Sequence, residues 1–157
     1  MTQLTVVIGV GNVYRRDDGV GPAVAEVVEA RRLPGVRVVR CAAETTALLD
    51  AWTGSGLAVI VDASVGGTPG RVRYGTFDDF GDAPQLSSHE LSLTQTYQLA
   101  LALGRAPESV RVVTVDVADT SHGVGLTPAV RAAITEAVRS VERIIVEQSE
   151  KSADKKA

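Results

Sequence analysis

Short apolar runs rich in β-branched residues alternate along the chain with stretches in which apolar residues recur every three or four positions. The runs predict strands, and the wider spacing predicts helices. Strands are expected at residues 4–8, 36–41, 57–61, 70–74 and 110–117, and helices at about 20–32, 45–52, 87–103 and 128–147. The run 57–61 is apolar throughout, which is typical of a central strand, whereas 70–74 alternates arginine with apolar residues, as an edge strand does.

This alternation of strands and helices predicts the fold class: a three-layer, doubly wound α/β fold, in which helices cover both faces of a mostly parallel sheet. The chain has 157 residues, a length that suits one domain. We expect residues 1–147 to form that single domain and the polar residues 148–157 to be a disordered tail. Ligand sites in such folds lie beyond the carboxyl ends of the strands.

Composition removes several classes of function. The net charge is −3, with none of the concentrated basic residues that bind nucleic acid, and no apolar stretch approaches the length of a membrane helix. Cys41 is the only cysteine, so an intramolecular disulfide is impossible and a reducing, cytoplasmic location is expected. We interpret Cys41 as a small buried apolar residue rather than as a nucleophile.

The glycine turn after the first strand does not fit a nucleotide site. A dinucleotide fingerprint that starts at Gly9 and Gly11 needs a small residue at position 14, where this chain has Tyr14. The same turn carries the acid pair 17–18, which would repel a phosphate. The three lysines all lie in the C-terminal tail, which excludes a phosphate-binding P-loop and a phosphoacceptor receiver domain.

Three polar residues are expected to meet at the carboxyl edge of the sheet. Asp18 follows the first strand, Asp62 ends the third, and His89 lies in the first turn of a helix that Ser87 and Glu90 would open as a capping box. Two carboxylates and an imidazole suit an open three-ligand site for nickel, zinc or iron. On spacing alone, capping roles for the two aspartates and an exposed histidine fit equally well.

Six motifs follow one another along nearly the whole chain. They are Gly9-Val10-Gly11-Asn12, Asp17-Asp18-Gly19-Val20-Gly21, Val61-Asp62-Ala63, Ser87-Ser88-His89, Leu103-Gly104-Arg105-Ala106-Pro107 and Gly123-Val124-Gly125-Leu126-Thr127-Pro128. In this order the sequence resembles the [NiFe]-hydrogenase maturation endopeptidases. One glycine pair would be a weak signal, but several ordered matches are specific.

The resemblance implies an aspartyl-type endopeptidase that removes a short C-terminal extension from the precursor of the hydrogenase large subunit. Members of this family act after nickel has been loaded into the precursor. The resemblance therefore implies that Asp18, Asp62 and His89 contact a metal that belongs to the substrate, and that other divalent metals can occupy the same site. It also leads us to expect a monomer with no permanently bound cofactor, whose partner is the precursor.

One segment departs from the family pattern and leaves the catalytic group open. Many members have an acid followed by Gly-Gly-Thr after the second strand, whereas this chain has Cys41–Thr45, with the acid at Glu44. Either Glu44 replaces the missing acid or the segment is only structural. The candidate general bases on water are Asp17 and Glu44, although Asp17 suits a turn equally well, and the metal itself can polarise the carbonyl or activate water. The alternative function is a non-catalytic metal- or partner-binding module on the same fold.

Four further residues near these motifs have structural interpretations. Asn12 is expected to stabilise the turn through its side-chain amide. His122 lies in a glycine-rich loop, where we expect a structural or exposed position. Arg15 and Arg16 are expected to be solvated, with a contact to the precursor as the alternative.

Overall fold

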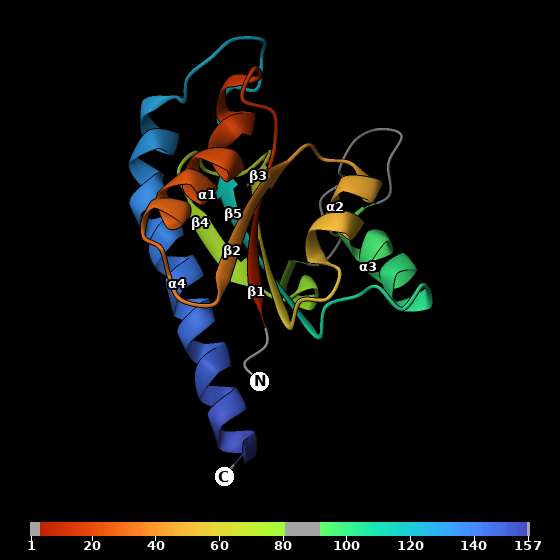
Figure 1. Ribbon diagram of the computed structural model, residues 1–157. Coiled ribbons are helices and arrows are strands. Elements are labelled where there is room, and N and C mark those ends of the chain that lie inside the picture. Colours follow the sequence, from red (N-terminus) through yellow and green to blue (C-terminus); the bar gives the residue numbers. More distant parts are fainter. Residues whose placement is uncertain (1–3, 81–91, 157) are drawn as a thin grey trace.

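The computed structural model describes residues 4–80 and 92–156 and contains a five-stranded sheet (Figure 1). The strands are β1 (Thr5–Val10), β2 (Val36–Cys41), β3 (Leu57–Ser64), β4 (Val72–Gly75) and β5 (Ser109–Asp116). Their order in the sheet is β2-β1-β3-β5-β4, and every neighbouring pair is parallel except β4 with β5. The predicted central strand, β3, is indeed central, and the predicted edge strand, β4, lies at the edge.

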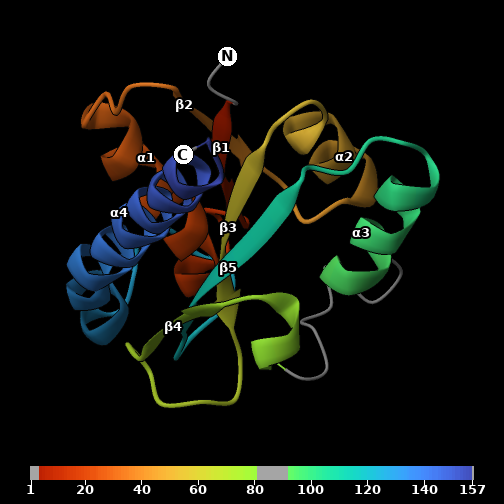
Figure 2. The same cartoon turned by 90° about the horizontal axis from the view of Figure 1, so that it is seen from below.

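Helices cover both faces of the sheet, as Figure 2 shows from below. The long helices are α1 (Val20–Ala30), α2 (Thr45–Trp52), α3 (Leu93–Ala102) and α4 (Pro128–Lys156), and two short 3-10 turns are η1 (Arg16–Gly19) and η2 (Phe77–Phe80). Helices α1 and α4 pack on one face, and α2 and α3 on the other. The three-layer, mostly parallel α/β fold predicted from the sequence is confirmed. None of the helices in the described ranges is long and apolar enough to cross a membrane.

The alternation of side chains along each strand divides the core in two. In β3, Val59 and Val61 belong to the α1/α4 side, whereas Ala58 and Ile60 belong to the α2/α3 side, where Trp52 is fully buried. Successive strand residues point to opposite faces, so the side of any strand residue follows from its neighbours. Asp62 therefore faces the α2/α3 side.

Two glycines, Gly9 near the end of β1 and Gly21 in α1, allow α1 to lie directly on the sheet. A Cβ atom on Gly9 would lie 2.4 Å from the carbonyl oxygen of Gly21, and one on Gly21 would lie 2.4 Å from the carbonyl oxygen of Val10. Real Cβ atoms do not approach backbone this closely, so both positions need glycine. These glycines serve helix–strand packing.

The third long helix begins later than the sequence analysis expected. It starts at Leu93, because Ser92 caps it: Ser92 Oγ accepts a hydrogen bond from Gln95 N (3.2 Å), and Gln95 Oε1 accepts one from Ser92 N (3.0 Å). The expected start at Ser87 was therefore wrong, since the same capping-box spacing recurs at 92–95 and the helix uses that copy. Residues 87–90 themselves lie outside the described residues.

The C-terminal helix is longer than expected. Residues 148–157 were predicted to be a disordered tail, but α4 continues to Lys156 and extends past the end of the sheet (Figure 1). Glutamate, glutamine, lysine and alanine favour helices, and this stretch contains neither glycine nor proline to end one. Polarity was a poor guide here, because a solvated helix is also polar.

Candidate functional site

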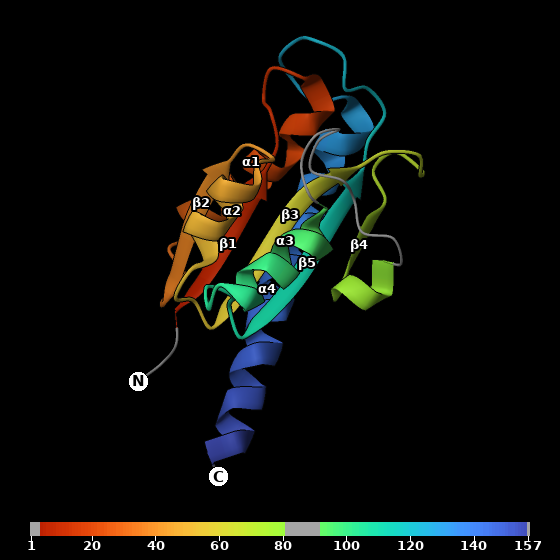
Figure 3. The ribbon, with the colours of Figure 1, turned by 90° about the vertical axis from the view of Figure 1, so that its right-hand side faces the viewer.

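The loops that follow β1, β3 and β5 gather at one end of the sheet (Figure 3). The loop after β1 turns sharply at Gly11, whose φ is 152° and whose Cβ, if present, would lie 1.9 Å from the carbonyl oxygen of Asp18. Gly11 N also donates to the carbonyl oxygen of Cys41 at the end of β2 (3.2 Å). The turn is thus folded back over the ends of the first two strands, at the position where doubly wound folds bind ligands.

Asp18 lies half-buried in this turn, at the end of η1. Its Oδ2 accepts a hydrogen bond from Asn12 N (2.8 Å), and Asn12 Oδ1 accepts one from Tyr14 N (2.9 Å). The second contact is an Asx turn, so the predicted structural role of Asn12 is confirmed. Together these bonds fix the position of the Asp18 carboxylate.

Asp62 lies near the end of β3 and is buried, with only 7% of its surface exposed. Its Oδ1 accepts a hydrogen bond from Ala63 N (2.8 Å). Burial raises the pKa of Asp62 to about 7; the nearby charge of Asp18 adds to the rise and the bond from Ala63 opposes it. The two carboxylates are therefore close enough to repel each other, an arrangement that a bound cation would relieve.

The structure brings together two of the three predicted metal-contacting residues and does not test the third. Asp18 and Asp62 interact electrostatically at the end of the sheet where the parallel strands terminate. His89 lies outside the described residues. Within residues 4–80 and 92–156, the histidine, cysteine and acidic side chains form no group of three that could hold a metal. The metal-contacting role of all three residues stays a prediction.

The segment that departs from the family pattern lies beside Asp62. Cys41 is half-buried, and burial raises the pKa of its thiol to about 11, with further contributions from the charges of Asp62 and Glu44. Glu44 is exposed and precedes α2 without capping it through its side chain. The interpretation of Cys41 as a poor nucleophile agrees with this raised pKa, because the thiolate is the reactive form.

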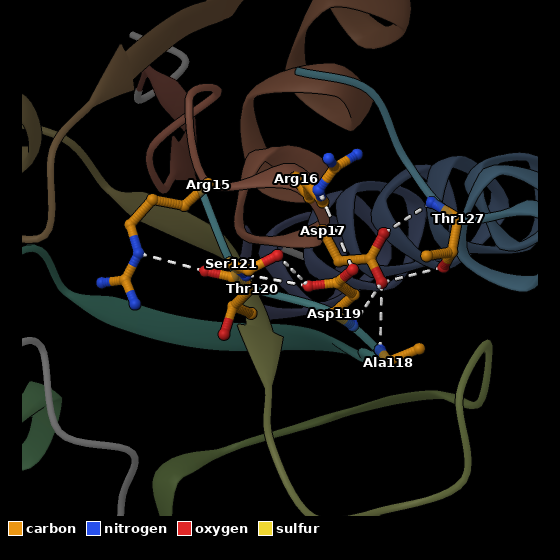
Figure 4. A network of polar contacts seen from close by, with 8 residues as sticks. All are labelled: Arg15, Arg16, Asp17, Ala118, Asp119, Thr120, Ser121 and Thr127. Atoms are coloured by element: carbon orange, nitrogen blue, oxygen red, sulfur yellow. Dashed lines mark hydrogen bonds and ion pairs between the residues drawn. The ribbon is translucent and has the colours of Figure 1, made fainter. Parts of the chain in front are cut away.

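Asp17 is fully buried and contacts the loop between β5 and α4 (Figure 4). Its Oδ2 accepts hydrogen bonds from Ala118 N, Asp119 N (both 3.0 Å) and Thr127 Oγ1 (2.8 Å), and its Oδ1 accepts one from Thr127 N (2.7 Å). Burial raises the pKa of Asp17, but these four bonds more than offset it, so the pKa lies below its ordinary value. We call this set the Asp17 network. Of the two roles left open for Asp17, the structure shows the structural one.

The loop between β5 and α4 is tied to the acid-bearing turn by further contacts. Arg16 N donates to the carbonyl oxygen of Gly123 (3.0 Å), and Gly123 N donates to that of Tyr14 (2.9 Å). The side chain of Arg15 bonds the carbonyl oxygen of Thr120 (3.2 Å). The two arginines are therefore part of the loop packing as well as partly solvated.

His122 lies in this same loop and is exposed, as predicted. Nearby, the Arg16 guanidinium lies 3.8 Å from the carboxylate of Asp119. This contact adds an ion pair to the side of the Asp17 network that faces solvent (Figure 4).

A row of polar residues crosses the sheet at the level of Asp62. Strand pairing places Val10 beside Cys41, Asp62 beside Thr114, and Thr114 beside Arg73. On β1 and β3, Gly9 pairs with Val61, so Val10 and Asp62 are the next residues along these two neighbouring strands. All these side chains lie on the α2/α3 side, by the alternation described above. We call Cys41, Asp62, Thr114 and Arg73 the polar row.

Asp116, at the end of β5, was not among the predicted site residues. It is 1% exposed; its Oδ2 accepts a hydrogen bond from Thr68 N (3.1 Å), and its Oδ1 lies 3.4 Å from Arg73 Nη2. A Cβ on Gly67 would lie 2.0 Å from Asp116 Oδ2, so the loop after β3 wraps closely around this carboxylate. The signal that identified Asp62, an acid closing an apolar strand, is present here too and would have found it.

The comparisons with known proteins agree with this fold. The family model described as HycI, hydrogenase maturation protease, matches residues 22–144. The hydrogenase maturating endopeptidase HybD from E. coli is 25% identical, with 92% of this chain and 93% of that chain covered and a TM-score of 0.78. The [NiFe] hydrogenase maturation protease HybD from Thermococcus kodakarensis is 21% identical over 90% and 98% of the two chains, with a TM-score of 0.73, and supports the fold alone. No curated protein matches the chain.

The fold and the family match together define the class of this protein as a peptidase, which is a hydrolase. The match covers well over half of the chain. The chain belongs to the hydrogenase maturation protease family.

Proposed function

We propose that this protein is the endopeptidase that removes the C-terminal extension of a nickel-loaded [NiFe]-hydrogenase large-subunit precursor. The observation that carries the proposal is the meeting of Asp18 with the buried Asp62 at the carboxyl edge of the sheet in a member of this family. Two carboxylates that repel each other at a ligand-binding position favour a cation brought by a partner.

In this proposal Asp18, Asp62 and His89 bind the substrate's nickel, and the protein holds no cofactor of its own. Nickel accepts carboxylate and imidazole ligands. Binding through the metal limits processing to precursors that have been loaded, and it positions the scissile bond at the sheet edge. Other divalent metals with the same ligand preferences would compete for the site.

We further propose that Glu44, rather than Asp17, is the general base. The oxygens of Asp17 already accept four hydrogen bonds, and its lowered pKa makes it a weak base, whereas Glu44 is exposed and lies near Cys41, which in turn lies near Asp62. Glu44 would take a proton from the attacking water, and the leaving amine would receive it as the C–N bond breaks. Polarisation of the carbonyl by nickel is compatible with this step.

The test is a processing assay with purified nickel-loaded precursor, read as loss of mass at the precursor's C-terminus. Wild-type protein should trim the loaded precursor but not the nickel-free one. Asp62→Asn should reduce the rate at least about 100-fold through loss of metal binding, and Glu44→Gln should reduce it about 100-fold with metal binding intact. Full activity in Glu44→Gln would remove Glu44 from the reaction, and absence of trimming by wild type would favour the non-catalytic module.

A further inference from the structure

The three most exposed large apolar side chains of the described residues all lie in loops at the carboxyl end of the sheet. They are Tyr14, Val65 and Val124, which are 69%, 80% and 73% exposed, whereas the next one, Leu101, is 56% exposed. Single exposed apolar residues are ordinary, but several of them gathered at one end of a molecule mark an interaction site. We call Tyr14, Val65 and Val124 the apolar tips.

Each apolar tip belongs to a loop that follows one of three neighbouring parallel strands. Tyr14 follows β1, Val65 follows β3 and Val124 follows β5, and β3 lies between the other two strands in the sheet. Parallel strands end on the same side, so the three loops leave the sheet together, as Figure 3 shows. The apolar tips therefore border the end of the sheet that carries Asp18 and Asp62.

Hydrogen bonds hold the backbone beneath the apolar tips. The amide of Gly123 donates to the carbonyl oxygen of Tyr14 (2.9 Å), which ties the loop after β5 to the loop after β1. The Asp17 network joins the same two loops. At the exit of β3, the carbonyl oxygen of Ser64, the residue before Val65, accepts a hydrogen bond from the first amide after β5 (3.0 Å). Side chains on ordered backbone lose less entropy when they bind, which favours association with a partner.

The apolar tips adjoin the two aspartates that are predicted to contact metal. Tyr14 N donates to Asn12 Oδ1, and Asn12 N donates to Asp18 Oδ2. Val65 lies three residues after Asp62. A polypeptide that brings a metal to the aspartates therefore comes within reach of the apolar tips. Apolar contacts around a polar anchor exclude water and so strengthen the polar interaction.

Arg15 adds a positive charge to the same end of the molecule. It is exposed; its Nε donates to the carbonyl oxygen of Thr120 (3.2 Å), and it takes part in no ion pair within residues 4–80 and 92–156. The neighbouring cation, Arg16, is paired with Asp119. An unpaired guanidinium beside an apolar surface favours a partner that carries a carboxylate.

We propose that the apolar tips and Arg15 form a docking surface for the large-subunit precursor, which contacts them through an apolar patch and a neighbouring carboxylate. The identity of the partner rests on the proposed function. Recognition then has two parts: the aspartates contact the metal, and the docking surface contacts the polypeptide whether or not a metal is present. The docking surface supplies affinity, and the metal decides which docked precursor is processed.

The first test measures the binding of nickel-free precursor to the full chain by surface plasmon resonance. Tyr14→Ser should weaken binding about tenfold, and Val65→Ser and Val124→Ser about threefold to tenfold each, because each variant no longer buries an apolar side chain. The backbone bonds remain, so Tm should not change. Wild-type affinity in all three variants would overturn the docking surface, as would a lack of detectable binding by wild type.

Val146→Ser is the matched control. Val146 is 55% exposed on α4, about 27 Å along the helix from Pro128 and outside the three loops. The substitution is the same as at the two valine tips, so it removes the same side chain from another part of the surface. The affinity for the precursor should stay at the wild-type value. A loss equal to that of the tip variants would show that position does not matter and would contradict the proposal.

Substitutions of Arg15 test the carboxylate of the partner. Arg15→Glu should weaken binding of the nickel-free precursor about tenfold at about 50 mM NaCl and less at about 500 mM, where salt screens the charges. Arg15→Lys keeps the charge but loses the bond to Thr120, and its affinity should stay within about twofold of wild type. Wild-type affinity in Arg15→Glu, or equal weakening in both variants, would remove the carboxylate from the proposal.

Processing of the nickel-loaded precursor separates docking from the reaction. Tyr14→Ser should raise KM about tenfold and leave kcat within about twofold of wild type, because the apolar tips contact no reacting group. A fall in kcat with KM unchanged would rule out a docking role. If wild type bound the nickel-free precursor through the apolar tips but failed to trim the loaded one, the proposed function would fall and the docking surface would stand.

Discussion

Two buried aspartates at the same end of the sheet differ in nearly every electrostatic respect. Asp17 accepts four hydrogen bonds, and its pKa lies below the ordinary value, whereas Asp62 accepts one bond from the next residue's N–H, and burial raises its pKa to about 7. Burial alone therefore does not determine the pKa of a carboxylate; the supply of N–H and O–H donors does. The Asp17 network holds the loops after β1 and β5 together, whereas the Asp62 carboxylate has a single hydrogen bond from the next residue.

The largest expected effect is on the free energy of unfolding, compared between variants of Asp17 and Asp18. Asp17→Ala should lower the free energy of unfolding by about 3–5 kcal/mol, because Ala118, Asp119 and Thr127 would lose their shared acceptor. Asp18→Ala, the matched control one residue along, should cost about 1 kcal/mol or less, since only Asn12 N loses its partner. Urea denaturation of both variants measures this, and similar losses in the two would refute the contrast.

The second expected effect is on the reactivity of the Cys41 thiol, which belongs to the polar row. A Cys41 pKa of about 11 leaves a thiolate fraction of about 0.001 at pH 8, so iodoacetamide should react on the order of 100-fold more slowly than with a free cysteine. The alkylation rate should keep rising with pH beyond pH 9, where free cysteine reaches its plateau. Asp62→Asn should speed the reaction, because one of the charges that raise the pKa is removed. A plateau near pH 9 in wild type would show that the thiol is not perturbed.

The smallest effect isolates one bond of the Asp17 network. Thr127→Val removes the hydroxyl that donates to Asp17 Oδ2 but keeps the backbone donor to Oδ1. The free energy of unfolding should fall by about 1 kcal/mol, the usual value for one hydrogen bond. Thermal unfolding against wild type measures it, with Thr127→Ser as the control that keeps the hydroxyl. No change in Thr127→Val would mean that the backbone bonds alone hold the loop.

The sequence predicted the strands well because an apolar run reports burial directly, as it does for β3. For the same reason, the sequence placed Asp62 at the carboxyl end of that central strand. It could not identify the role of Asp17, because the donors that surround it lie 101 or more residues later in the chain. Local spacing gives no information about such distant partners.

Where local signals competed, the sequence was ambiguous. The capping-box spacing occurs at 87–90 and again at 92–95, and only the structure shows that Ser92 begins the helix. The polar C-terminal residues fitted a tail or a solvated helix equally well. The polar row depends on strand register, which the hydrophobic pattern does not specify across strands distant in sequence.

Strand β4 runs antiparallel to its one neighbour, β5, and this has a consequence for how the sheet presents its side chains. Parallel strands present only their final residues to this end of the sheet, whereas an antiparallel edge strand presents its first ones, which is how Arg73 arrives beside Thr114. An edge strand has one partner only, so it can be exchanged without rebuilding the centre. Asp62 thus lies on a central strand of the core, whereas Arg73 lies on an edge strand that can change with less effect on that core.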